Sequence, residues 1–213
     1  MKKAIVIGST GMVGTQLIDL LINSNEYSEI VSLVRRPSGI THPKLSEHPV
    51  DFDKIETWTR FVKGDVLFSC MGTTIAQAKT KENQYKIDYT YQYNVAETAS
   101  ANGVQTYVLI SSAGANPKST VFYSKMKGQL DEAVLKLPFK NIIILRPDQL
   151  YGNRTEKRLG EKVGLSVMFF LNRVGILRKH KPIHAREVAQ AMINVAENTQ
   201  TAIITSGDIF KLI

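Results

Sequence analysis

A tyrosine and a lysine stand four positions apart in this chain, at Tyr123 and Lys127. On a helix, this spacing places both side chains on one face. An ammonium group beside a phenol favours the ionised phenol, so Tyr123 is suited to exchange a proton with a carbonyl or alcohol oxygen. The pattern predicts a general acid/base tyrosine tuned by a lysine. Because it is also frequent by chance, a surface tyrosine beside a solvated lysine is the alternative.

Two serines, Ser111 and Ser112, follow an apolar stretch, 106–110, that predicts a strand. A hydroxyl at the end of this strand would hold the substrate oxygen next to the tyrosine. Counting back from Gly114 favours Ser111, whereas alignment on the strand favours Ser112, which we prefer. The serine pair upstream of Tyr123 strengthens the prediction of proton-transfer chemistry.

Three glycines lie between a predicted strand, 3–7, and a predicted helix, 12–22. The first permits a tight turn, the second lets the backbone approach a pyrophosphate, and the third lets the helix pack close to the sheet. The helix N-terminus would present free amide groups to the phosphates. Since the spacing is G-x-x-G-x-x-G rather than G-x-G-x-x-G, the strand-turn-helix context carries the prediction, and a purely structural turn is the alternative. The predicted phosphate loop consists of Gly8, Ser9, Thr10, Gly11, Met12, Val13 and Gly14.

Two arginines, Arg35 and Arg36, end the second predicted strand, 30–34. Dinucleotide-binding proteins specific for NAD place a carboxylate there to hold the ribose 2′-hydroxyl. A carboxylate would repel a 2′-phosphate, whereas a guanidinium group pairs with it through two hydrogen bonds. The pair therefore predicts NADP rather than NAD, unless the arginines merely flank a loop.

Strands and helices alternate along the chain, and the strands are apolar throughout. This pattern indicates a parallel sheet covered on both faces, an α/β fold of the doubly wound, Rossmann type. A loop is expected over 38–49, where prolines and turn formers gather. The predicted strands are 3–7, 30–34, 50–52, 65–70, 106–110, 141–145 and 201–205. The predicted helices are 12–22, 54–61, 83–102, 122–137 and 185–197.

The composition limits the possible folds and cellular locations of the protein. The chain has 213 residues, 43% of them hydrophobic, which suits one α/β domain over 1–213, with 148–183 covering the substrate. One cysteine, Cys70, excludes an internal disulfide and favours a reducing compartment, so we expect a cytoplasmic protein. No apolar run reaches the roughly 18 residues of a transmembrane helix. The histidines show no metal-ligand spacing, so no metal site is expected.

The net charge of +8 is concentrated in one segment. Between Arg154 and Lys181 the chain has eight basic residues and two acidic ones. Such a patch favours cofactor phosphates, acidic substrates or a lipid surface. Nucleic acid is not expected, because no aromatic-basic platform accompanies the charge. The apolar run Val163–Leu177 predicts a helix that packs on the sheet or covers the substrate or, alternatively, attaches to a membrane surface. No pattern predicts an oligomeric state.

Taken together, these motifs resemble the short-chain dehydrogenase/reductase superfamily, in its extended and atypical branches. A closer likeness is to small NADP-binding oxidoreductases related to the human Tat-interacting protein. The match runs from the first strand to about residue 160 and again at 182–184. The strings that carry it, besides the glycine loop, are Leu33–Pro37, Cys70–Thr74, Ser111–Ala115, Tyr123–Gly128 and Leu145–Pro147.

The resemblance implies further roles. Asp51 and Phe52 would flank the adenine, and Leu150 and Arg158 would close over the nicotinamide end. It also implies that Lys127 hydrogen-bonds the nicotinamide ribose. The adenosine and ribose would be lined by Cys70, Met71, Gly72 and Thr73.

The expected function is hydride transfer between NADPH and a small carbonyl or alcohol substrate, with Tyr123, Lys127 and Ser112 or Ser111 as the catalytic group. Two alternatives stay open. One is a non-enzymatic NADP(H)-sensing regulator, which needs the glycine loop and arginines but not Tyr123. The other is an epimerase or dehydratase acting on a nucleotide sugar, which uses the same proton-transfer groups.

Overall fold

The computed structural model describes residues 1–152, 182–198 and 200–213. They contain a seven-stranded sheet with the strand order β3-β2-β1-β4-β5-β6-β9. Every neighbouring pair in this sheet is parallel. The predicted Rossmann-type α/β fold is therefore confirmed. The strands are β1 (Lys2–Ile7), β2 (Tyr27–Val34), β3 (Leu45–Pro49), β4 (Val66–Ser69), β5 (Thr106–Ile110), β6 (Asn141–Arg146) and β9 (Ala202–Thr205).

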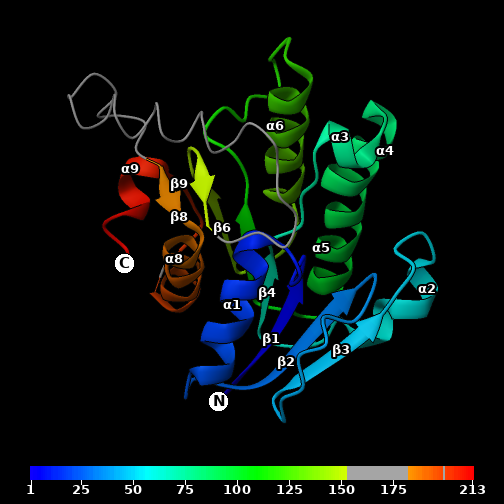
Figure 1. Ribbon diagram of the computed structural model, residues 1–213, viewed down its shortest axis with the longest axis vertical. Helices are drawn as coiled ribbons and strands as arrows, with labels where there is room; N and C mark the ends of the chain where they lie inside the picture. The colour runs from blue at the N-terminus through cyan, green and yellow to red at the C-terminus, as the bar shows by residue number, and fades with distance from the viewer. Residues whose placement is uncertain (153–181, 199) are drawn as a thin grey trace.

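Helices cover both faces of the sheet (Figure 1). One face packs against α1 (Met12–Asn23), α8 (Ala185–Asn198) and α9 (Ser206–Ile209). The other packs against α2 (Ile55–Trp58), α5 (Gln92–Ala101) and α6 (Phe122–Val134). Successive residues of β1 enter the two cores alternately, since Ala4 and Val6 lie in the first and Ile5 and Ile7 in the second. Burial on both faces explains why the strands are apolar throughout.

The strand order reverses between β1 and β4, and this reversal positions the site. In open parallel sheets, ligands bind outside the carboxyl ends of the strands at such a switch point. The glycine loop leaves β1 there, and the Cys70–Thr73 segment leaves β4 beside it. A hydrogen bond from Cys70 N to Ile7 O, 2.9 Å long, joins the two exits.

The prediction for the third strand is wrong. The structure places β3 at Leu45–Pro49, inside the expected loop 38–49, and Val50–Phe52 is not a strand. β3 pairs in parallel with β2, from Ile30 opposite Leu45 to Val34 opposite Pro49. It is the edge strand of the sheet, where a proline that donates no backbone hydrogen bond is tolerated.

The long helix predicted over 83–102 exists but is interrupted. It consists of α4 (Lys81–Tyr85), the π-helical turn η2 (Lys86–Tyr91) and α5, and it ends before Gly103, whose φ of +82° suits a helix C-terminus. The helix predicted over 54–61 is α2 followed by the 3₁₀ turn η1 (Thr59–Phe61). A short helix, α3 (Ile75–Ala78), follows β4 and was not predicted.

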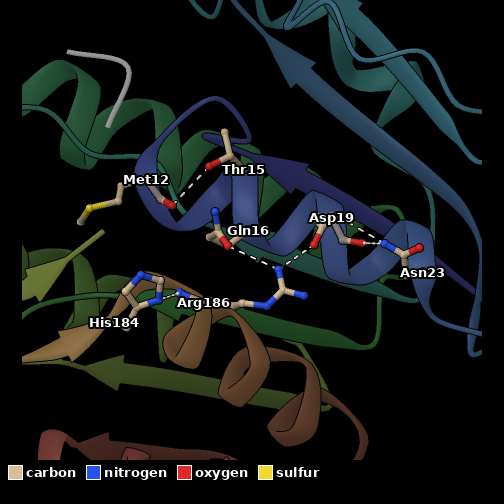
Figure 2. A network of polar contacts seen from close by, with 7 residues as sticks. All are labelled: Met12, Thr15, Gln16, Asp19, Asn23, His184 and Arg186. Atoms are coloured by element: carbon tan, nitrogen blue, oxygen red, sulfur yellow. Dashed lines mark hydrogen bonds and ion pairs between the residues drawn. The ribbon is translucent and has the colours of Figure 1, made fainter. Parts of the chain in front are cut away.

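A two-stranded parallel sheet pairs β7 (Leu150–Tyr151) with β8 (Ile183–His184) next to the start of α1. It was not predicted, since each strand has only two residues. Figure 2 shows the neighbouring contact, in which Arg186 of α8 points toward Gln16 and Asp19 of α1. The distance from Arg186 Nη1 to Asp19 Oδ2 is 2.6 Å. Arg158 and Val163–Leu177 lie outside the described residues.

Candidate cofactor and active site

The glycine loop after β1 forms a close-packed turn. Gly8 has a φ of +76°, and a Cβ added there would lie 2.5 Å from the carbonyl carbon of Cys70. A Cβ on Gly14 would collide with the carbonyl oxygen of Gly8. Both positions therefore require glycine. The N-cap of α1, Gly11, provides no side-chain hydrogen bond, so the first-turn amides are open to an anion.

Two buried hydroxyls fix the glycine loop to the second strand. The Ser32 hydroxyl of β2 donates to Ser9 Oγ over 2.7 Å, and the two residues are 0% and 4% exposed. Ser9 therefore turns its side chain into the protein and contributes its backbone to the loop surface. Thr10 is exposed, Met12 is half-buried, and Val13 lies in the core on α1.

The carboxyl end of β2 carries the two arginines expected to select the cofactor. Arg35 and Arg36 are exposed. Neither makes an ion pair within 4.0 Å among residues 1–152, 182–198 and 200–213. Asp51 is exposed nearby in the chain, but Phe52 is buried, and its ring lies 5.4 Å from that of Tyr91. Any contact of Phe52 with an adenine is therefore made through its backbone.

The segment after β4 turns its side chains in different directions. Cys70 Sγ lies 3.8 Å from Met192 Sδ on α8, and burial raises the pKa of this thiol. Met71 packs against the opposite core, and the Cα of Gly72 faces open space. Thr73 is held by its backbone N–H, which donates to Asp88 Oδ1 over 2.7 Å.

Tyr123 and Lys127 lie in the first turns of α6, as predicted. Tyr123 is 40% exposed, whereas Lys127 is only 3% exposed. Lys127 Nζ donates to the carbonyl oxygen of Ile110 at the end of β5, over a long 3.4 Å. Within the described part of the chain this is the one hydrogen bond of the ammonium group. A buried ammonium with open donors is suited to hold the hydroxyls of a ribose.

The two candidate serines differ in their surroundings. Ser111 is 6% exposed, and its hydroxyl faces the Asp131 carboxylate without forming a regular hydrogen bond. Ser112 is partly exposed at the start of the following loop. Ser112 is therefore the more accessible of the two.

Two buried carboxylates next to Lys127 were not predicted. Asp131 is 1% exposed and pairs with Arg146 of β6 over 2.8 Å. Burial raises its pKa, against the opposing effects of Ser111, Arg146 and Lys127. Asp88 is also 1% exposed, and burial raises its pKa to about 6, against the opposing effects of Lys127, the Thr73 N–H and Gln84.

A sequence signal for Asp88 existed but was overlooked. Gln84, Asp88 and Gln92 recur every four residues and lie on one buried face of the helix. Gln92 Nε2 donates to the carbonyl oxygen of Asp88 over 2.6 Å, and Gln92 Oε1 accepts from Ser69 Oγ over 2.7 Å. Polar residues in register with a buried stripe indicate a hydrogen-bonded network.

A surface groove of about 520 Å³ lies between α4, η2 and the start of α6. Lys81 Nζ lies 5.7 Å above the ring of Phe122 there. None of the predicted cofactor residues lines this groove. The groove is lined by Lys81, Glu82, Tyr85, Lys86, Thr90 and Phe122.

Two features are absent from the residues that the structure describes. None of the helices there combines the length and apolar character needed to cross a membrane. No group of three or more histidine, cysteine, aspartate or glutamate side chains is placed there to hold a metal ion.

A protein-family model, the NAD dependent epimerase/dehydratase family, matches residues 4–207. The chain belongs to this family. Among curated proteins it is similar to protein FMP52-1, mitochondrial, of Scheffersomyces stipitis, with 36% identity over 202 residues, 92% of this chain and 88% of the relative. Protein FMP52, mitochondrial, of Saccharomyces cerevisiae is 32% identical over 222 residues, 98% of this chain and 95% of the relative.

Solved structures in complex with UDP-glucose share the fold. MoeE5 in complex with UDP-glucose and NAD has a TM-score of 0.75 at 17% identity, over 95% of this chain and 75% of its own. UDP-glucose 4-epimerase of Thermotoga maritima, solved with UDP-glucose, has a TM-score of 0.71 at 16% identity. The match covers 98% of this chain and 80% of the epimerase chain. At such identities the likeness shows the fold alone.

These comparisons refine two expectations. The extended branch of the short-chain dehydrogenase/reductase superfamily is confirmed, and the curated relatives named above are FMP52 proteins; the finer likeness to the Tat-interacting oxidoreductase stays a prediction. The prediction of a cytoplasmic protein is contradicted, because these curated relatives are named mitochondrial. A low cysteine count fits any reducing compartment and does not distinguish between them.

Proposed function

We propose that the protein is an NADP-dependent oxidoreductase that transfers hydride between NADPH and a small carbonyl or alcohol substrate. The observation that carries the proposal is the buried ammonium of Lys127. It has open donors and lies one helical turn from an exposed tyrosine on α6, the helix that follows β5. The geometry of the glycine loop supports a dinucleotide at the same edge of the sheet.

Each part of the cofactor would be held by groups of matching chemistry. The loop from Gly8 to Gly14 and the free amides of α1 would bind the pyrophosphate. Arg35 and Arg36, which are exposed and make no ion pair among the described residues, would bind the 2′-phosphate and favour NADP over NAD. The Cys70–Thr73 segment would line the adenosine and ribose, with Asp51 and the backbone of Phe52 near the adenine and Leu150 toward the nicotinamide.

The chain itself would supply the proton chemistry. Bound NADPH contributes the hydride. Tyr123 would donate a proton to the carbonyl oxygen during reduction and accept one during alcohol oxidation. Lys127 would hold the ribose hydroxyls and favour the ionised phenol through its charge. Ser112, the more accessible serine, would anchor the substrate oxygen, with Ser111 as the alternative.

The variant Tyr123→Phe tests this function, because it removes one hydroxyl and keeps the ring. We expect turnover to fall by roughly 10²–10⁴-fold, as for the loss of a general acid, while the affinity for NADPH stays unchanged. Tyr85→Phe, on the outer helix α4, is the matched control and should keep full turnover. Wild-type rates in Tyr123→Phe would refute the assigned role.

A second candidate function is epimerisation of a nucleotide sugar. The family match and the structural likeness to UDP-sugar epimerases favour it. An epimerase returns the hydride to its substrate, so cofactor would not be consumed. Incubation with UDP-glucose and catalytic amounts of NAD or NADP distinguishes the two, since an oxidoreductase would form no epimer.

A further inference from the structure

Asp88 is placed by a local departure from regular helix. It lies within the π-helical turn η2, and such turns are frequent at functional sites. Its carboxylate is buried and accepts the backbone N–H of Thr73 over 2.7 Å. Gln84 Nε2 lies beside it, donating to the carbonyl oxygen of Thr73 over 3.4 Å. The turn therefore directs a carboxylate toward the segment expected to line the cofactor ribose.

The charges around Asp88 differ from those around Asp131. Asp131 has its own cation, since Arg146 lies 2.8 Å away. No ion pair within 4.0 Å joins Asp88 to a cation in the described ranges. The turn η2 packs against α6, and the buried Lys127 of that helix is the cation that acts on Asp88, whereas Thr73 and Gln84 supply neutral donors. Lys86, its neighbour on the turn, is exposed and pairs with Asp53.

We propose that Asp88 is a positioning residue: its buried carboxylate fixes the Thr73 segment and acts on the charge of Lys127, so that it couples the ribose-lining loop to the lysine. Its effect on catalysis rests on the proposed function, but the coupling itself does not. The buried location gives the charge a strong influence on Lys127, because screening by water is weak there.

A pH dependence follows from this arrangement. The pKa of Asp88 is raised by burial to about 6, so the carboxylate loses its charge as the pH falls through that value. Below it, the bond from the Thr73 N–H is no longer charge-assisted, and the negative charge of Asp88 no longer acts on Lys127. The protein should therefore bind NADPH more weakly at pH 5 than at pH 8.

The direct test follows the carboxyl carbon of Asp88 by NMR against pH. In wild type the midpoint should lie near pH 6. Lys127→Met should raise it by roughly one unit or more, the effect of removing an opposite charge. Lys125→Met removes an exposed lysine from the same helix and should leave the midpoint in place. An unchanged midpoint in folded Lys127→Met would overturn the proposal.

A second measurement carries the test if Lys127→Met does not fold. The affinity for NADPH is measured from pH 5 to 8 in wild type and in Asp88→Asn. The 2′-phosphate titrates in both, so the difference between the curves isolates Asp88. As the pH rises through 6, we expect the ratio of the wild-type affinity to that of Asp88→Asn to grow roughly fivefold, as for one lost charge-assisted hydrogen bond. Parallel affinity curves would contradict the coupling. Neither measurement needs a substrate, so failure to find a reducible carbonyl would refute only the proposed function.

Discussion

At the scale of single residues, the motifs that can be recognised in the sequence are those whose functional residues lie close together in the chain. Tyr123 and Lys127 fall on one helix, and the glycines fall in one turn, because each group is local in the chain. Asp88 and Asp131 were missed because their importance comes from burial beside Lys127, and Asp88 reaches it across 39 positions of sequence. The Gln84-Asp88-Gln92 repeat marked a buried polar stripe, but only the fold brings Asp88 close to α6.

The arginines after β2 carry a prediction about cofactor choice. Replacing both, as Arg35→Ser and Arg36→Ser, removes the groups proposed to pair with the 2′-phosphate. We expect the affinity for NADPH to fall roughly 10–100-fold, the value of one or two charge-assisted hydrogen bonds. Affinity for NADH, measured by the same fluorescence titration, should stay unchanged and serves as the control. An equal loss for both cofactors would exclude this role.

Asp88 also predicts how stability depends on pH. Its pKa is 3.8 in an ordinary environment and about 6 in the folded protein. Because the pKa of Asp88 is higher in the folded than in the unfolded protein, the protonated carboxyl favours folding. This contribution to the free energy of unfolding is fully present below pH 3.8, the unfolded-state pKa, and is lost as the pH rises through about 6. At pH 8, the free energy of unfolding of Asp88→Asn should therefore exceed that of wild type by about 3 kcal/mol. This figure follows from a pKa difference of roughly two units at about 1.4 kcal/mol per unit.

The difference between Asp88→Asn and wild type should vanish near pH 4, and urea unfolding across the pH range measures it. Asp53→Asn, at an exposed carboxylate whose pKa is lowered by Lys86, should not show this stabilisation. If Asp88→Asn were less stable than wild type at pH 8, the buried charged carboxylate would not lower the free energy of unfolding, contrary to this prediction.

At the scale of elements, the sequence predicted the six strands β1, β2, β4, β5, β6 and β9 because each is an apolar run. It failed for β3, because Leu45–Pro49 ends in a proline and has a polar centre. An edge strand needs only one neighbour and one covered face, so its composition is close to that of a loop. The two-residue strands β7 and β8 are too short for any periodicity.

Helix α6 fits against the loop that carries Ser112 only because Gly128 lacks a side chain. A Cβ at Gly128 would lie 2.6 Å from the backbone nitrogen of Asn116. Gly128→Ala should lower the free energy of unfolding by about 1–3 kcal/mol, as overpacking does. Gly207→Ala, on α9 with open space around it, is the matched control and should not destabilise. Equal effects in chemical denaturation would refute the close approach.

At the scale of the whole molecule, the strand-helix alternation was enough to predict the doubly wound sheet, since a parallel sheet needs helices on both faces. Location was not predictable in this way. The cysteine count led to a cytoplasmic expectation that the mitochondrial names of the relatives contradict. A low cysteine count indicates a reducing environment but does not distinguish one reducing compartment from another.

Cofactor binding should stabilise the entire domain. A ligand at a hundred times its dissociation constant adds about 2.7 kcal/mol to the free energy of unfolding. For a chain of this size, that corresponds to a rise in Tm of roughly 5–10 °C. Thermal unfolding with saturating NADPH measures the shift, and NADH at the same concentration should give a smaller one. The absence of any shift with either cofactor would argue against a dinucleotide site.

The central claim is that hydride passes from NADPH to a carbonyl carbon under the control of Tyr123. The most direct test supplies NADPH in which both hydrogens on the reactive carbon of the nicotinamide ring are replaced by deuterium, together with a panel of small carbonyl compounds. We predict that wild type forms an alcohol carrying one deuterium for each NADPH oxidised, and that Tyr123→Phe forms it roughly 10²–10⁴-fold more slowly. Deuterium that remains in the cofactor across the whole panel, with no alcohol formed, would contradict the claim.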